Sequence, residues 1–223
     1  LNEGVAQEKV LVTGNTGIDA LLSVRERLTQ DPASEIRFQE KYPAVYKAVR
    51  EKKKIVLVTT HRRESFGEPL RETLRSLLAL AERQDVKIFL PVHRNPMVLQ
   101  AVEEVLRPNG HKHSSVELLE PLDYVPFVWM MNQATLLLTD SGGVQEEAPS
   151  LGKPVLILRD KTERPEAVEA GTAILVGTDS KLILNHANRL LDSEQARADM
   201  AALKNPFGDG RATGRILDAL ARS

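Results

Sequence analysis

Four short polar segments of this 223-residue chain carry the residue types that could bind or transform a charged ligand. Each follows directly after an apolar run: HRRESFGE (61–68), HRNP (93–96), DSGG (140–143) and DKTERPEA (160–167). In an open parallel sheet, ligands bind beyond the carboxyl ends of the strands. If the apolar runs are parallel strands, the four segments converge on one edge of the sheet and form a common site.

The DSGG segment has the composition of an anion-binding turn. Gly142 and Gly143 would let the backbone turn tightly and approach a ligand without a Cβ clash. The N–H groups of a following helix would then point at the ligand, and the Ser141 hydroxyl would add a donor. Phosphate suits such a site, although an ordinary strand-to-helix turn would use the same residues. Glu146 and Glu147 would either stabilise the helix start or accept hydrogen bonds from a ribose.

The HRRESFGE segment begins with a cluster of charge: His61, Arg62, Arg63 and Glu64. Two fixed cations beside a histidine disfavour a metal ion, but they suit phosphate recognition or proton transfer. Arg164 stands where another apolar run has just ended, so its guanidinium could clamp an anion. A solvated charged loop is the alternative interpretation of this cluster.

Other polar and aromatic residues are less specific. His93 also follows an apolar run directly. Trp129 and Phe127 fit core packing, although one aromatic ring at the crevice could stack on a base. His111 and His113 are spaced like a metal pair, but no acid or third histidine is adjacent. We therefore favour an exposed loop there and predict no metal site.

The elements that must position these residues alternate along the chain. Apolar runs rich in Val, Ile and Leu, without polar alternation, are typical of strands buried on both faces of a parallel sheet. They span residues 9–13, 54–60, 86–92, 115–119, 134–139, 153–159 and 173–177. Amphipathic patterns predict helices at 18–28, 69–84, 96–106 and 125–131, and within 179–223 except for a break at 205–212. This alternation predicts an α/β fold with helices on both faces of the sheet.

Composition divides the chain into three parts. We expect residues 1–30 to be the tail of a preceding Rossmann-like domain, consisting of its last strand and helix. Residues 31–37, a polar stretch with Pro32, are expected to be a linker, and residues 38–223 the next domain. The chain starts at Leu1 and not at Met, so we expect that it begins inside a longer polypeptide.

The charge balance excludes several classes of partner. Thirty Lys and Arg residues face 31 Asp and Glu residues, so no global field attracts nucleic acid or an anionic membrane. The absence of cysteine excludes disulfides and thiolate chemistry, which fits a cytoplasmic protein. No run approaches the roughly 18 apolar residues of a membrane span. From the residues alone, the chain is an α/β domain that binds a phosphate-bearing ligand such as a nucleotide.

The combination of motifs is more specific. In this order, HRRESFGE, PVHRNP, DSGGVQEEAPSLGKPVLILRDKTERPEAVEAGT and NPFGDGRA closely resemble the non-hydrolysing UDP-N-acetylglucosamine 2-epimerases. The opening VTGNTGIDALL also resembles that family, except that Gly17 stands where a larger aliphatic residue is usual. The resemblance covers essentially the whole chain, but only the C-terminal half of the family's polypeptide. It implies a glycosyltransferase-B type fold, in which the nucleotide sugar lies between two Rossmann-like domains.

The resemblance also implies which residues bind UDP. Carried over by position, they are Phe127, Ser141, Gly142, Gly143, Glu147 and Arg164. The serine and glycines would hold the diphosphate, the glutamate the ribose hydroxyls, the arginine a phosphate, and the phenylalanine would lie beside uracil. Arg62, Glu64 and His93 match positions of a second, activating UDP-N-acetylglucosamine site.

The family's reaction inverts C2 of the sugar by anti elimination of UDP to 2-acetamidoglucal, followed by re-addition. The resemblance implies that His61 is catalytic, near the leaving phosphates, and that no cofactor is needed. The other catalytic carboxylates belong to the family's first domain, so this chain alone is expected to be inactive. Family members are commonly homodimers.

Three alternatives stay open at this point. A hydrolysing epimerase or a glycosyltransferase would share the fold and the UDP site, although the HRRES form favours the non-hydrolysing branch. The third alternative is a UDP-sugar-sensing module without catalysis.

Overall fold

A parallel sheet of six strands forms the centre of the molecule, in the order β3–β2–β1–β4–β5–β6. The computed structural model describes residues 4–222. The strands are β1 Lys54–Thr59, β2 Val86–Pro91, β3 Val116–Leu119, β4 Leu136–Thr139, β5 Val155–Ile157 and β6 Ala173–Leu175. Every neighbouring pair is parallel, and the order reverses between β1 and β4. The predicted doubly wound α/β architecture is confirmed.

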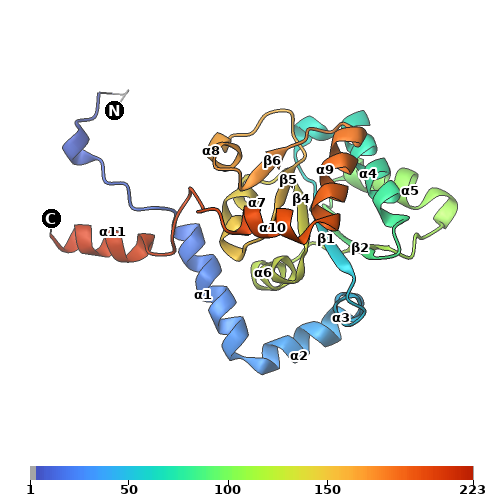
Figure 1. Cartoon of the computed structure of the whole chain (residues 1–223), viewed down its shortest axis with the longest axis horizontal. Coiled ribbons are helices and arrows are strands. Elements are labelled where there is room, and N and C mark those ends of the chain that lie inside the picture. Colours follow the sequence, from blue (N-terminus) through green and yellow to red (C-terminus); the bar gives the residue numbers. More distant parts are fainter. Residues whose placement is uncertain (1–3, 223) are drawn as a thin grey trace.

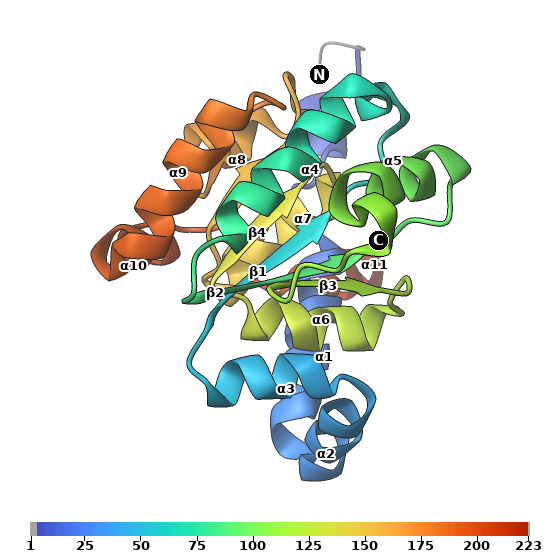
Figure 2. The same ribbon diagram turned by 90° about the vertical axis from the view of Figure 1, so that its right-hand side faces the viewer.

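Helices cover both faces of this sheet. They are α1 Thr16–Gln30, α2 Pro32–Lys41, α3 Pro43–Arg50, α4 Glu68–Ala81, α5 Pro96–Leu106, α6 Tyr124–Gln133, α7 Gly142–Glu147, α8 Pro165–Glu169, α9 Ser180–Asp192, α10 Glu194–Ala201 and α11 Ala212–Ala221 (Figure 1). Figure 2 shows α4, α5 and α9 on one side of the sheet and α1, α3 and α6 on the other.

The residues of β1 explain why the apolar runs do not alternate with polar residues. Ile55 and Leu57 are buried in the layer that contains α6, whereas Val56 and Val58 are buried in the layer that contains α4. Both faces of the strand are therefore buried, and every position in the run requires an apolar side chain. The predicted helices at 18–28, 69–84, 96–106 and 125–131 correspond to α1, α4, α5 and α6.

The predicted strand at 9–13 is wrong. A short 3₁₀ turn spans Gln7–Lys9, and the following residues have no regular structure. Val10, Leu11 and Val12 are 46%, 64% and 89% exposed. Within residues 4–222 no strand lies beside this segment, and an extended apolar run becomes a strand only where a neighbour accepts its backbone hydrogen bonds.

The predicted linker at 31–37 is also wrong in its secondary structure. Helix α2 begins at Pro32 and continues to Lys41, past the expected boundary at residue 38. Asp31 caps it by accepting a hydrogen bond from Ala33 N at 3.1 Å, and Pro32 occupies the first turn. The polar stretch with Pro32 that suggested a linker is therefore a helix start, the position where proline is well tolerated. The domain boundaries themselves stay predictions.

Helix α2 is joined to α6 through Trp129, which is buried as expected. The indole Nε1 donates a hydrogen bond to Glu35 Oε2 at 2.7 Å. The rings of Phe38 and Tyr42 lie 5.3 and 5.9 Å from the indole ring, centroid to centroid. An aromatic cluster of this kind stabilises the junction by burial and by ring contacts.

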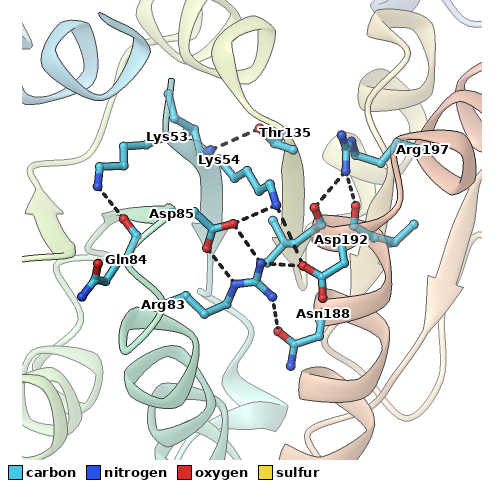
Figure 3. A network of polar contacts seen from close by, with 12 residues as sticks. Lys53, Lys54, Arg83, Gln84, Asp85, Thr135, Asn188, Asp192 and Arg197 are labelled. Atoms are coloured by element: carbon cyan, nitrogen blue, oxygen red, sulfur yellow. Dashed lines mark hydrogen bonds and ion pairs between the residues drawn. The ribbon is translucent and has the colours of Figure 1, made fainter. Parts of the chain in front are cut away.

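A network of charged groups ties the amino ends of β1 and β2 to α9 (Figure 3). Arg83 binds both oxygens of Asp85, at 3.0 and 2.9 Å, and reaches Asp192 Oδ1 at 2.6 Å. Lys54 Nζ lies 2.8 Å from Asp85 Oδ2. Hydrogen bonds from Arg83 and then from Lys54 hold the pKa of Asp85 well below its usual value. The network lies at the end of the sheet opposite the four polar segments, so its role is structural.

From Ser180 to Ala221 the chain is helical apart from Ser193 and residues 202–211, so the predicted break at 205–212 is confirmed except at Ala212, which begins α11. The break returns the chain to α1: Asn15 N donates to Phe207 O at 3.1 Å, and Thr213 N donates to Asp19 Oδ1 at 2.8 Å. Figure 1 shows segment 4–15 and α11 projecting from the same side of the body. Across residues 4–222, none of the helices is long and apolar enough to cross a bilayer.

Candidate functional site

The carboxyl ends of β1 and β4 lie side by side at the point where the strand order reverses. Thr59 and Thr139 are register partners, and their hydroxyl oxygens are 2.6 Å apart. At such a switch point the loops diverge to opposite faces of the sheet and leave a crevice for a ligand. A hollow of about 250 Å³ opens here, and His61, His93, Phe127 and Ser141 are among the residues that line it.

Asp140 joins the loops that follow β1 and β4. Its side chain is 1% exposed, and Oδ2 accepts hydrogen bonds from His61 N at 2.7 Å and Arg62 N at 2.8 Å. Oδ1 lies 2.9 Å from His61 Nδ1. The sequence pattern assigns no role to Asp140, although its carboxylate follows a buried strand directly. Its contacts join residues that are 78 and 79 positions apart, so the sequence pattern could not reveal them.

The DSGG segment forms the expected strand-to-helix turn. Ser141 precedes α7, and Ser141 N donates to Thr139 Oγ1 at 2.9 Å. A Cβ atom added to Gly142 would lie 3.7 Å from Arg62 Nη2 and 3.8 Å from the guanidinium carbon of Arg164. Two guanidinium groups therefore flank the start of α7. This arrangement concentrates positive charge where the free N–H groups of the turn are found.

Arg164 is held by an acid on α7. Its Nε donates a short hydrogen bond to Glu146 Oε1, and the second oxygen of Glu146 accepts from Asn15 Nδ2 at 2.6 Å. Arg164 Nη1 donates to Glu163 O at 3.1 Å. The bond to Glu146 raises the pKa of Arg164. The sequence predicts Glu146 only as a residue that stabilises the helix start or binds ribose, and it does not reveal the contact that fixes the guanidinium.

Glu147, the predicted ribose acceptor, is partly buried on the next position of α7. Burial raises the pKa of Glu147, and the nearby Glu146 adds to the increase, whereas the hydrogen bond from Tyr124 Oη at 3.0 Å opposes it. Burial raises the pKa of the Tyr124 phenol, and the charge of Glu147 and the hydrogen bond to it add to the increase. The Glu147 carboxylate thus has one donor in this structure and can accept further hydrogen bonds.

The residues matched to an activator site divide into separate places. The ring of His93 lies 6.3 Å from that of His61, and both line the same hollow. Arg62 lies against Gly142, and its Nη2 is 3.6 Å from Glu163 Oε2. Glu64 instead pairs with Arg159 at 2.6 Å beside a second hollow of about 400 Å³. The structure brings His61, His93, Phe127 and Ser141 together, and it places Glu64 elsewhere.

His111 and His113 do not converge. His113 Nδ1 accepts from Ser115 N at 3.2 Å, and its Nε2 lies 3.4 Å from Glu82, whereas His111 is exposed. Within the described part of the chain, no three His, Asp or Glu side chains are grouped as metal ligands.

The family profile described as UDP-N-acetylglucosamine 2-epimerase matches residues 1–221. The UDP-N-acetylglucosamine 2-epimerase of Escherichia coli K12 is 50% identical over 221 residues, which are 99% of this chain and 57% of the relative. The crystal structure of the Neisseria meningitidis enzyme bound to UDP-GlcNAc aligns with a TM-score of 0.90 and 39% identity, over 100% of this chain and 58% of that one.

Another solved relative gives a similar result. The Methanocaldococcus jannaschii enzyme, solved with UDP-GlcNAc and UDP, aligns with a TM-score of 0.76 and 30% identity, over 100% of this chain and 57% of that one. The chain therefore spans a little more than half the length of these relatives. The six-stranded sheet and the helices on its two faces form a Rossmann-like domain of the glycosyltransferase-B type. From the profile, the identities and the fold together, the chain belongs to the UDP-N-acetylglucosamine 2-epimerase family.

Proposed function

We propose that this chain is the UDP-binding half of a non-hydrolysing epimerase that interconverts UDP-N-acetylglucosamine and UDP-N-acetylmannosamine. The observation that carries the proposal is the approach of Arg62 and Arg164 to Gly142, beside a hollow lined by His61. A diphosphate carries the charge that two guanidinium groups and a helix start would neutralise. Relatives of this chain have been solved with UDP-GlcNAc and UDP bound.

The remaining binding roles are carried over from the family resemblance. Ser141 and Gly143 lie at the start of α7 and would donate to the diphosphate. Glu147 would accept hydrogen bonds from the ribose hydroxyls, and Phe127, on the wall of the hollow, would lie against uracil. An acid that binds ribose hydroxyls near a phosphate-binding turn is common in nucleotide-binding Rossmann-like folds.

The reaction needs a base, a leaving group, and delivery of a proton to the opposite face of C2. A base takes the proton from C2, the C1–O bond breaks with its electron pair going to UDP, and a C1–C2 double bond forms. UDP then adds back while a proton reaches C2 on the other face. His61 would act at the leaving diphosphate, and the carboxylates that act at C2 would come from the other domain of the family's polypeptide. The 223-residue chain alone is therefore expected to show no turnover.

Assembly and location are proposed from the family alone. We expect the complete protein to be a homodimer in the cytoplasm, with the other Rossmann-like domain of the same polypeptide completing the cleft. Residues Arg62, Glu64 and His93 stay candidates for an activator site, and the separation of Glu64 from the hollow near His61 makes it the weakest of the three.

Isothermal titration calorimetry of the 223-residue chain with UDP tests the proposal, with AMP as the control nucleotide. Selective binding of UDP in the micromolar range is the expected result. Equal affinity for UDP and AMP would contradict a uracil site. Absence of UDP binding to the folded chain, also when the upstream domain is restored, would reject the proposed function.

A further inference from the structure

The buried carboxylate of Asp140 satisfies only part of its hydrogen-bonding capacity through the backbone. Oδ2 accepts from His61 N and Arg62 N, as described above. Oδ1 is fully buried, and among residues 4–222 it has no hydrogen-bond partner apart from its approach to the His61 ring. A buried carboxylate oxygen without a donor is strongly destabilising, so the group facing it matters for the state of the whole loop.

The group that faces Oδ1 is Nδ1 of His61, at 2.9 Å. In a neutral imidazole one nitrogen carries the proton and the other is an acceptor. Acceptor lone pairs on Nδ1 and Oδ1 would repel each other at this distance, whereas a proton on Nδ1 gives Asp140 the donor that it lacks. We propose that Asp140 is a positioning residue that holds His61 in the tautomer protonated at Nδ1, with the reactive Nε2 on the opposite side of the ring.

The orientation follows from the shape of the ring. The two nitrogens of imidazole point in divergent directions, so binding Nδ1 to Asp140 turns Nε2 away from the buried carboxylate. His61 is 40% exposed at its side chain and lines the hollow, whereas Asp140 is closed off from it. The ring of His93 also lies nearby, 6.3 Å away between centroids, which is too far for a hydrogen bond to Nδ1 of His61.

For the reaction, this inference rests on the proposed function. An imidazole with its Nδ1 proton fixed can gain and lose a proton only at Nε2. When cationic, it can donate the Nε2 proton to the departing diphosphate oxygen as the C1–O bond breaks, and recover it when UDP adds back. The Asp140 carboxylate would stabilise the cationic ring, as orienting carboxylates do for catalytic histidines elsewhere.

Long-range ¹H–¹⁵N correlation spectra of the ¹⁵N-histidine-labelled chain test the tautomer directly. The spectra are recorded at about pH 8, where an unperturbed imidazole is neutral. The chain has five histidines, and His61→Gln identifies the signals of His61 by their loss. The expected wild-type result is a neutral His61 with its proton on Nδ1, although free histidine favours Nε2. A wild-type His61 protonated at Nε2 would overturn the proposal without the use of any Asp140 variant.

The Asp140→Asn variant provides a second test. Its carboxamide oxygen can keep the backbone bonds, and its NH₂ group then faces Nδ1, so His61 should change to the form protonated at Nε2. The matched control is Asp160→Asn, the same change at an exposed position after the neighbouring strand, which should leave the His61 signals unchanged. A folded Asp140→Asn chain that keeps the Nδ1 form would also overturn the proposal.

The outcome is separable from that of UDP binding. If UDP fails to bind while His61 has the Nδ1 form that depends on Asp140, the proposed function fails and the positioning role stands. If UDP binds and the tautomer is the other one, the positioning role fails alone.

Discussion

Glu146 accepts a hydrogen bond from Arg164 with one carboxylate oxygen and uses the other to bind Asn15. The guanidinium that flanks the start of α7 is therefore oriented by an acid on that same helix. Because Asn15 caps α1, the acid also links segment 4–15 to the candidate UDP site. Orientation of a cation before the ligand arrives reduces the entropy lost on binding.

Replacement of Arg164 by alanine tests the phosphate contact. We expect Arg164→Ala to weaken UDP binding by about 2 kcal/mol, roughly 30-fold, because a hydrogen bond to a charged group is lost. Calorimetry measures the change, and Arg50→Ala on α3 serves as a control for the loss of one exposed positive charge. Equal affinity of wild type and Arg164→Ala would remove this residue from the site.

The orienting acid can be tested without removal of the arginine. In Glu146→Gln, one oxygen can still accept from Arg164, but the new NH₂ group faces the donor of Asn15. We expect UDP binding to weaken by about 1 kcal/mol, roughly fivefold. In the double variant with Arg164→Ala, the loss of binding free energy should be smaller than the sum of the two single losses, because both residues act through one contact. Additive losses would show that Glu146 acts on binding by another route.

Glu147 should oppose stability and favour binding. Because burial raises its pKa in the folded chain, the stability that protonation confers is complete below the unfolded pKa, about 4.3, and is lost as pH rises through the higher folded pKa. Glu147→Gln should therefore gain stability relative to wild type at pH 7, and gain less at pH 4. Urea denaturation at both pH values measures the difference.

The same Glu147→Gln variant should bind UDP more weakly, by about 1 kcal/mol, because an uncharged amide accepts weaker hydrogen bonds. An increase in stability with unchanged UDP affinity would indicate that Glu147 is not a ligand of the nucleotide.

The network at the other end of the sheet should affect stability alone. Asp85→Asn removes the charge that binds Arg83 and Lys54, and the Asp85 side chain is 44% exposed, so solvent screening limits the loss to about 1 kcal/mol at pH 7. The pKa of Asp85 is depressed in the folded chain, so its contribution is present above the unfolded pKa and declines as pH falls through the folded one.

The difference between wild type and Asp85→Asn should thus shrink in acid, with UDP affinity unchanged. Asp218→Asn, at an exposed position on α11, is the matched control. A constant difference across the acid range would mean that the charge of Asp85 is not what stabilises this end of the sheet.

The strands of the sheet could be predicted from the sequence because a run of apolar residues marks each of them locally. Six aliphatic runs became strands, and in β1, within the run 54–60, both faces of the strand are buried. The strand predicted from the similar run at 9–13 is wrong, since no strand among residues 4–222 accepts its backbone hydrogen bonds. The polar stretch with Pro32 gave a wrong prediction for a different reason: a proline among polar residues suits both a linker and a helix start.

The candidate site was predictable only in part. That His61, His93 and Ser141 would meet followed from the rule that ligands bind at the carboxyl ends of parallel strands, whereas the place of Phe127 was implied only by the family resemblance. The orienting contacts of Asp140 and Glu146 join side chains far apart in the chain, and no spacing rule connects them. The separation of Glu64 from His61 likewise depends on how the short turn Arg63–Ser65 directs its side chain toward Arg159.

The junction between α2 and α6 gives the chain an internal optical reporter. Trp129 is the single tryptophan, it is 3% exposed, and its indole contacts Glu35, Phe38 and Tyr42. Separation of α2 from α6 would admit water to the indole and shift its fluorescence to longer wavelength. Because Trp129 is not among the residues that line the hollow near His61, that shift would follow the loosening of α2 independently of nucleotide binding.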